Sequence, residues 1–179
     1  MLTLPTVITL VRLALLPVLL WLLLDGNLWA ALGLYIFGAV TDFFDGYLAR
    51  KLNQVTPFGT FLDPIADKIY VCAIFIALIA IDHITGLSLL AVIIILSREF
   101  MVSGLREYLG PMNVTLPVST LAKWKTTAQM VATGFLIIAG AAPYTHEAGT
   151  ALLWIAAILT VTTGTAYLKT GLAHMKSTS

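Results

Sequence analysis

Hydrophobic residues fill six long stretches of this chain, and short polar segments separate them. The stretches run over residues 1–24, 28–49, 61–81, 87–105, 120–142 and 148–168. An α-helix needs about 20 mostly apolar residues to cross the hydrocarbon core of a bilayer, and each stretch is close to that length. The pattern therefore predicts an all-α, polytopic membrane protein with six transmembrane helices, forming a single domain over residues 1–179.

The composition agrees with this prediction and excludes other classes. Of the 179 residues, 59% are hydrophobic and 11% are charged, with a mean hydropathy of +0.96, which is typical of multi-spanning membrane proteins. The net charge is +1 and no basic run is present, so no nucleic-acid partner is expected. One cysteine, Cys72, excludes an internal disulfide framework and gives no indication of a zinc site.

Two of the predicted spans carry carboxylates at one end. The uncharged parts of the second and third stretches are too short to cross a bilayer alone. The second helix must therefore include Asp42 and Asp45, and the third must reach back past Asp67 and Asp63. Ionisable residues inside membrane segments usually serve a function, so these two pairs are the first candidates for a site.

The basic residues indicate which way the helices face. They lie at alternate connections, in the tail or on the same predicted side: Arg12, Arg50, Lys51, Arg98, Arg106, Lys123, Lys125, Lys169 and Lys176. The turns at Asp25, Asp82 and Glu147 contain no Lys or Arg. Because cytoplasmic loops carry the excess of Lys and Arg, we expect both termini and the acidic pairs to face the cytoplasm.

At about 100° per residue, each acidic pair shares one helix face with small residues. The first face comprises Asp42, Asp45, Gly46 and Ala49, and the second Gly59, Asp63 and Asp67. Two such faces could hold divalent cations through oxygen ligands and leave room for a bulky ligand. Ordinary explanations also exist, since Asp63 before Pro64 could be an N-cap and Asp42 could lie at a helix end near water.

The acidic segment resembles the signature of the CDP-alcohol phosphotransferase family. The pattern is Asp42-x2-Asp45-Gly46-x2-Ala49-Arg50, eight residues, then Gly59-x3-Asp63-x3-Asp67, and it agrees at all eight fixed positions. By this resemblance, the four aspartates would hold two divalent cations, Mg²⁺ or Mn²⁺. Gly46, Ala49, Arg50 and Gly59 would line the site for the CDP part of the donor. Asp67 would be the general base, and the protein would be a homodimer.

A second set of residues resembles the branch of that family that uses glycerol 3-phosphate as acceptor. The matching segments are Ser97-Arg98-Glu99, Ser103-Gly104-Leu105-Arg106 and Lys123-x-Lys125-Thr126-x2-Gln129-Met130. A phosphate-bearing acceptor needs cations, so we predict that Arg98, Arg106, Lys123 and Lys125 bind its phosphate and that Glu99 orients Arg98. The alternative for the two lysines is plain anchoring on the cytoplasmic side.

The N-terminal segment Leu4-Pro5-Thr6-x2-Thr9-x2-Arg12 is similar to the family's opening motif. Relatives often carry asparagine where this chain has Thr3 and Thr6. Two interpretations of Arg12 stay open, a contact with nucleotide or phosphate and snorkelling to the membrane interface.

The activity that the resemblance implies is transfer of a phosphatidyl group from CDP-diacylglycerol to glycerol 3-phosphate, with release of CMP. The enzyme would lie in a bacterial inner membrane with its site facing the cytoplasm. One alternative is the same chemistry with serine, inositol phosphate or phosphatidylglycerol as acceptor. A second is an ion or proton carrier, although a carrier needs neither the small residues nor the basic cluster.

Overall fold

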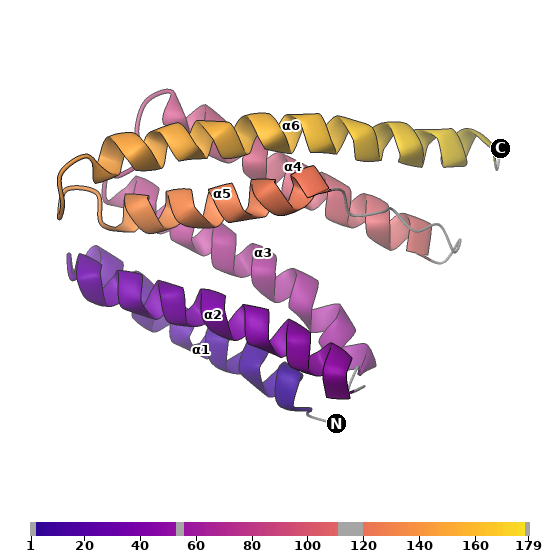
Figure 1. Ribbon diagram of the computed structural model, residues 1–179, viewed down its shortest axis with the longest axis horizontal. Helices are drawn as coiled ribbons and strands as arrows, with labels where there is room; N and C mark the ends of the chain where they lie inside the picture. Colours follow the sequence, from indigo (N-terminus) through magenta and orange to yellow (C-terminus); the bar gives the residue numbers. More distant parts are fainter. Residues whose placement is uncertain (1–2, 53–55, 111–119, 178–179) are drawn as a thin grey trace.

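The computed structural model describes residues 3–52, 56–110 and 120–177, and these residues form six α-helices (Figure 1). The helices are α1 Leu4–Leu24, α2 Leu28–Leu52, α3 Pro57–Ala80, α4 Ser88–Leu109, α5 Thr120–Ile137 and α6 Thr145–Ser177. The predicted all-α class is therefore confirmed. Within the described residues, three helical segments are long and apolar enough to cross a bilayer, namely Thr6–Leu24, Ser88–Leu109 and Thr145–Thr165. This finding indicates a membrane protein.

The start of α3 decides between two interpretations of Asp63. The N-cap of α3 is Thr56, whose Oγ1 accepts a hydrogen bond from the backbone N–H of Gly59 at 3.1 Å. The helix therefore begins at Pro57, and Asp63 lies in its interior, beyond the first turn. The alternative that Asp63 is an N-cap is wrong.

The last two helices differ from their predicted bounds. α5 ends at Ile137 rather than 142, because a turn follows in which Gly140 adopts a φ of 87° that favours glycine. Thr145 closes this turn by donating to the carbonyl oxygens of Ile138 (3.1 Å) and Ala142 (2.7 Å). α6 starts at Thr145 and continues to Ser177, nine residues past the predicted end of the sixth span at 168.

The helices pack in two groups. α1 packs against α2 and α3, while α6 packs against α4 and α5, and α3 also contacts α4 and α5. Gly149 permits the close approach of α6 to α5, since a Cβ at that position would lie 2.8 Å from Cγ of Leu136. Both termini lie at one end of the molecule (Figure 1).

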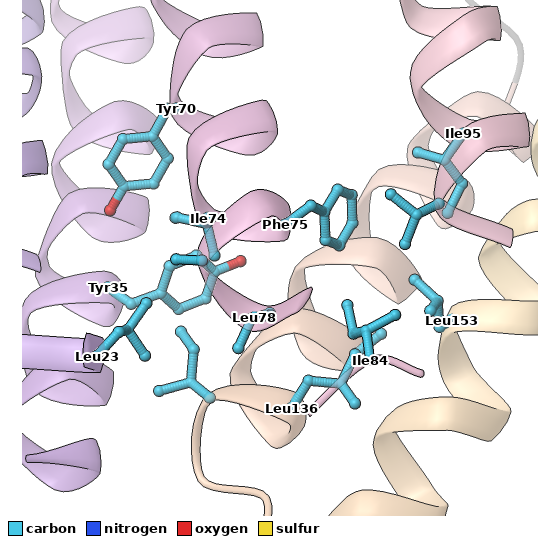
Figure 2. Close-up of a cluster of buried hydrophobic side chains, with 14 of the residues drawn as sticks. Leu23, Tyr35, Tyr70, Ile74, Phe75, Leu78, Ile84, Ile95, Leu136 and Leu153 are labelled. Carbon is cyan, nitrogen blue, oxygen red and sulfur yellow. The ribbon is translucent and has the colours of Figure 1, made fainter. Parts of the chain in front are cut away.

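Large apolar side chains lie both inside and outside the helical bundle. The buried cluster draws residues from all six helices, among them Leu19, Leu23, Tyr35, Ile74, Phe75, Leu78, Ile95, Leu136 and Leu153 (Figure 2). Large hydrophobic residues are also exposed, including Trp21, Trp29, Ile76, Ile93 and Ile158. Helices that are apolar on every side are typical of proteins surrounded by lipid.

Candidate functional site

The two carboxylates of α3 are held by polar residues of α1. Oγ1 of Thr9 donates a hydrogen bond to Oδ1 of Asp63 at 2.9 Å. Nη2 of Arg12 donates to Oδ1 of Asp67 at 2.5 Å, which makes a charged pair between the same two helices. Thr9 and Arg12 are three residues apart, and so are neighbours on one face of α1. The N-terminal half of α1 is therefore part of the acidic site.

Arg12 is buried, although the carboxylate that it contacts is not. Its side chain is 7% exposed, whereas that of Asp67 is 54% exposed. The guanidinium carbon lies 5.7 Å from the ring centroid of Tyr70, within cation–π range. The interpretation of Arg12 as a residue that snorkels to the interface is wrong, because its side chain is buried between α1, α2 and α3.

Small residues make this packing possible. A Cβ at Gly38 would lie 2.6 Å from the hydroxyl oxygen of Tyr70, so the absence of a side chain at Gly38 leaves room for that tyrosine. A Cβ at Gly59 would lie 3.0 Å from Oγ1 of Thr6. The predicted contact of Gly59 with the CDP part of the donor stays a prediction, and helix packing is a further reason for a glycine there.

The donor chemistry of α3 fits a hard divalent cation. Asp63 and Asp67 are both exposed and one helical turn apart, and carboxylate oxygens are the ligands that Mg²⁺ and Mn²⁺ prefer. The side chains of Asp42, Asp45, Gly46, Ala49 and Arg50 lie outside the described residues. Among the side chains that are described, no group of three or more His, Cys, Asp or Glu could hold a metal ion. The four-aspartate site stays a prediction.

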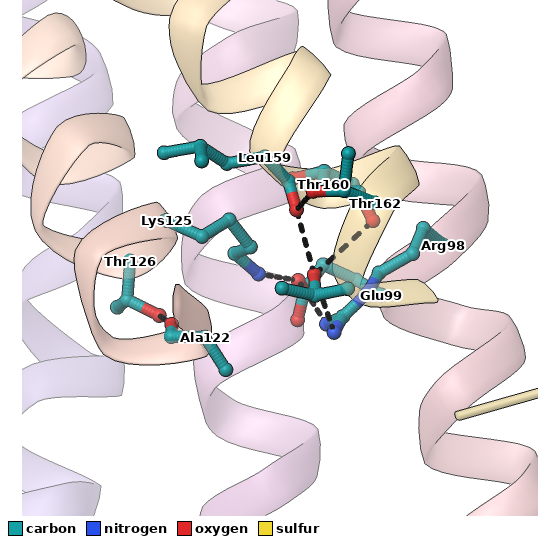
Figure 3. Close-up of polar contacts among 9 residues, drawn as sticks. Arg98, Glu99, Ala122, Lys125, Thr126, Leu159, Thr160 and Thr162 are labelled. Carbon is teal, nitrogen blue, oxygen red and sulfur yellow. Dashed lines mark hydrogen bonds and ion pairs between the residues drawn. The ribbon is translucent and has the colours of Figure 1, made fainter. Parts of the chain in front are cut away.

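A second charged site lies where α4, α5 and α6 meet (Figure 3). Oε1 of Glu99 accepts from Nη1 of Arg98 at 3.3 Å and also from Nζ of Lys125. Nη2 of Arg98 donates to Oγ1 of Thr163 on α6 at 3.2 Å. Lys125 is only 4% exposed, so its pairing with Glu99 offsets the cost of burying its charge. Glu99 orients Arg98, as predicted, and also holds Lys125.

One tyrosine joins the two arginines of α4. The guanidinium carbons of Arg98 and Arg106 lie 5.4 Å and 5.5 Å from the ring centroid of Tyr167. Lys123 is exposed whereas Lys125 is buried, so the two lysines face different sides of α5. The structure therefore brings together Arg98, Arg106 and Lys125. A role for Lys123 stays a prediction.

The residues that α6 contributes were absent from the sequence prediction. Thr160, Thr163, Gly164 and Tyr167 are all buried, and their spacing of three, four and seven residues places them on one helix face. A Cβ at Gly164 would lie 2.9 Å from Cγ of Arg98, so this face is fitted to that arginine. The polar spacing was a signal in the sequence, but its partner on α4 could not be known from it.

An open apolar groove of about 600 Å³ lies between α2 and α5. Leu32, Ile36, Val40, Val131 and Phe135 are among the residues that line it. No ionisable side chain other than that of Tyr35 is among its lining residues, so the groove suits hydrocarbon rather than a charged group.

The two charged sites lie on neighbouring helices, because α3 packs against both α4 and α5. The carboxylates of α3 can accept a proton or hold a cation, and the basic cluster can bind an anion such as a phosphate. The arrangement suits a reaction between two phosphate-bearing molecules.

Proteins similar to this chain share one description. The sequence pattern of the family described as CDP-alcohol phosphatidyltransferase matches residues 2–162. A protein of Rickettsia bellii (strain RML369-C) is 45% identical over 172 residues, which cover 93% of each chain. One of Haemophilus influenzae is 38% identical, covering 92% of this chain and 91% of that protein. One of Bacillus subtilis (strain 168) is 36% identical, covering 100% of both. All three are named CDP-diacylglycerol--glycerol-3-phosphate 3-phosphatidyltransferase.

Proposed function

Since the chain belongs to the CDP-alcohol phosphatidyltransferase family, we propose that it transfers the phosphatidyl group of CDP-diacylglycerol to glycerol 3-phosphate and releases CMP. The family membership confirms the resemblance that the signature residues indicated. The observation that carries the choice of acceptor is the packing of Arg98 and Arg106 against one ring, that of Tyr167, since guanidinium groups suit a phosphate.

In the proposed reaction, the basic cluster holds the phosphate of glycerol 3-phosphate and leaves its hydroxyl free to reach α3. Asp67, oriented by Arg12, accepts the proton of that hydroxyl. The hydroxyl oxygen forms a bond to the phosphorus that carries the diacylglycerol. The bond from this phosphorus to the oxygen bridging to CMP breaks, and CMP leaves with that oxygen. Holding both reactants in place supplies much of the rate enhancement.

Asp42, Asp45, Asp63 and Asp67 would hold two divalent cations, Mg²⁺ or Mn²⁺. Such cations, when bound, neutralise the pyrophosphate and stabilise charge on the departing CMP. Gly46, Ala49, Arg50 and Gly59 would face the CDP part of the donor. The exposure of Asp63 and Asp67 supports this assignment, because a bound nucleotide could reach both carboxylates.

The donor is a lipid, so the proposal includes a bilayer around the helices. We place all six helices across a bacterial inner membrane, with both termini and the site on the cytoplasmic side, as a homodimer. The apolar groove between α2 and α5 would take a hydrocarbon chain of the donor. The exposed hydrophobic side chains support this arrangement, since each would otherwise contact water.

The test is CMP release by purified protein in detergent with CDP-diacylglycerol and Mg²⁺ or Mn²⁺. The acceptors to compare are glycerol 3-phosphate, serine, inositol phosphate and phosphatidylglycerol. We expect CMP release with glycerol 3-phosphate and loss of activity when a chelator removes the metal. Release with serine alone would contradict the choice of glycerol 3-phosphate as acceptor. No release with any acceptor would contradict the proposed enzymatic activity.

A further inference from the structure

The hydroxyl group of Tyr167 is buried. The side chain is 5% exposed, and its hydroxyl has no hydrogen-bond partner among the described residues. Nε of Arg98, whose guanidinium group faces the ring of Tyr167, is also buried and lacks a partner there. Buried polar groups are nearly always hydrogen-bonded, so two buried donors on side chains that pack against each other suit an acceptor that comes from a ligand.

The charge around Tyr167 indicates what kind of ligand this is. Arg98 and Arg106 both lie within cation–π range of its ring, although their Cα atoms are two helical turns apart, about 12 Å along α4. Glu99 pairs with Arg98, whereas no carboxylate contact is described for Arg106. An anion with several acceptor oxygens, such as a phosphate, would satisfy both the charge and the hydroxyl.

We propose that Tyr167 determines specificity for the acceptor of the proposed reaction. Its ring holds Arg98 and Arg106 at one phosphate site, and its hydroxyl donates a hydrogen bond to the phosphate of glycerol 3-phosphate. This inference rests on the proposed function. It goes beyond the family assignment, which gives no role to Tyr167.

Two substitutions separate the roles of the ring and the hydroxyl. Tyr167→Phe keeps the ring and removes the hydroxyl, and it should raise the KM for glycerol 3-phosphate about tenfold, the scale of one hydrogen bond to a charged group. Tyr167→Leu also removes the contact with the guanidinium groups and should raise this KM further. In both variants, the KM for CDP-diacylglycerol should stay within about twofold of that of the unaltered protein, because binding of the donor is assigned to other residues.

The matched control is Tyr108→Phe, since Tyr108 is an exposed tyrosine on α4 just after Arg106. It should leave both KM values unchanged. Isothermal calorimetry with glycerol 3-phosphate alone provides a second readout that does not depend on turnover, and both Tyr167 variants should bind more weakly. The melting temperature in detergent shows whether each variant is folded, and Tyr167→Phe keeps the inference testable if Tyr167→Leu unfolds.

Failure of the proposed function and failure of the proposed role of Tyr167 would give different results. An unaltered protein that releases no CMP with glycerol 3-phosphate would contradict the proposed function. An active protein in which both variants bind glycerol 3-phosphate as tightly as before would overturn the role of Tyr167. A rise of equal size in both KM values would overturn it too, since that result indicates a general disturbance of the fold.

Discussion

The charged side chains of the two candidate sites depend on partners from other helices. Arg12 on α1 pairs with Asp67 on α3, and Lys125 on α5 pairs with Glu99 on α4. Charges inside a bilayer are unfavourable unless they are paired or reach water. Each pair therefore holds a chemically active group in place and also joins two helices, so substitutions here should affect stability, activity or both.

Replacing the proposed base tests its role directly. Asp67→Asn keeps the size of the side chain but removes a group that can accept the proton. It should retain binding of CDP-diacylglycerol and lower kcat about 10²- to 10⁴-fold. Asp25→Asn, in the exposed turn after α1, is the matched control and should have normal kcat. Near-normal turnover by Asp67→Asn in the CMP assay would rule out Asp67 as the general base.

Glu99 offers a test of the basic cluster. Glu99→Gln removes the negative charge between Arg98 and the buried Lys125. Removing one partner leaves the buried ammonium group of Lys125 without its carboxylate, which should cost about 1–3 kcal/mol of stability. The measurement is the melting temperature in detergent, with Glu107→Gln as control because Glu107 is exposed on the same helix. Equal melting temperatures for the two variants would contradict the importance of this pairing.

At the scale of the elements, three helix crossings have a glycine at the point of close contact, where a Cβ atom would clash with the neighbouring helix. Gly38 of α2 leaves room for Tyr70 of α3, and Gly149 of α6 leaves room for Leu136 of α5. Gly164 of α6 leaves room for Arg98 of α4. Small residues at such crossings let helices approach closely, which is how helices associate in lipid. Two of these three crossings also fix residues of the candidate sites.

The crossing at Gly38 can be tested with a pair of alanine substitutions. Gly38→Ala introduces a Cβ 2.6 Å from the hydroxyl oxygen of Tyr70, so it should displace the tyrosine from Arg12 and destabilise the fold by about 1–3 kcal/mol. Gly33→Ala meets no atom within 4 Å and should be neutral or stabilising by up to about 1 kcal/mol. Equal thermal stability of the two variants in detergent would show that Tyr70 does not require this space.

At the scale of the whole molecule, the two termini lie at one end. Figure 1 shows both termini at the same end, and the short turns 25–27, 81–87 and 138–144 each follow a helix that runs away from it. In the proposed orientation this end faces the cytoplasm, so a soluble acceptor would arrive there while a lipid donor enters between helices.

Cysteine labelling tests the proposed orientation. In a Cys72→Ser background, Asn27→Cys and Glu147→Cys place thiols at the outer turns, and Glu107→Cys places one at the opposite end, all at exposed positions. A membrane-impermeant maleimide should label the first two in spheroplasts and the third only after permeabilisation. Labelling of Glu107→Cys alone in intact spheroplasts would show that the orientation is the opposite of the one proposed. Equal labelling of Glu107→Cys and Glu147→Cys would contradict a crossing of the membrane by α5.

Much of the fold and part of the site could be predicted from the sequence. Hydrophobic length predicted all six helices, and motif spacing placed Asp63 with Asp67 and Arg98 with Arg106, because such positions repeat along one helix. The contacts of Arg12 and Tyr167 could not be predicted, since they join residues more than 50 positions apart whose proximity depends on how the helices cross. The end of α5 was missed because alanines continue the apolar pattern past Gly140.

The pairing of Glu99 with two cations also determines the net charge of the proposed acceptor site. Glu99 pairs with Arg98 and Lys125, and Arg106 packs against the ring of Tyr167 beside them, so these four charged groups carry a net charge of plus two. A phosphate monoester carries close to two negative charges near neutral pH, so glycerol 3-phosphate would bring the cluster to electroneutrality. Serine, with no net charge, would leave the excess uncompensated in a low-dielectric setting. The proposed site would therefore select acceptors by charge before shape, and inorganic phosphate or sulfate in a buffer should compete with glycerol 3-phosphate.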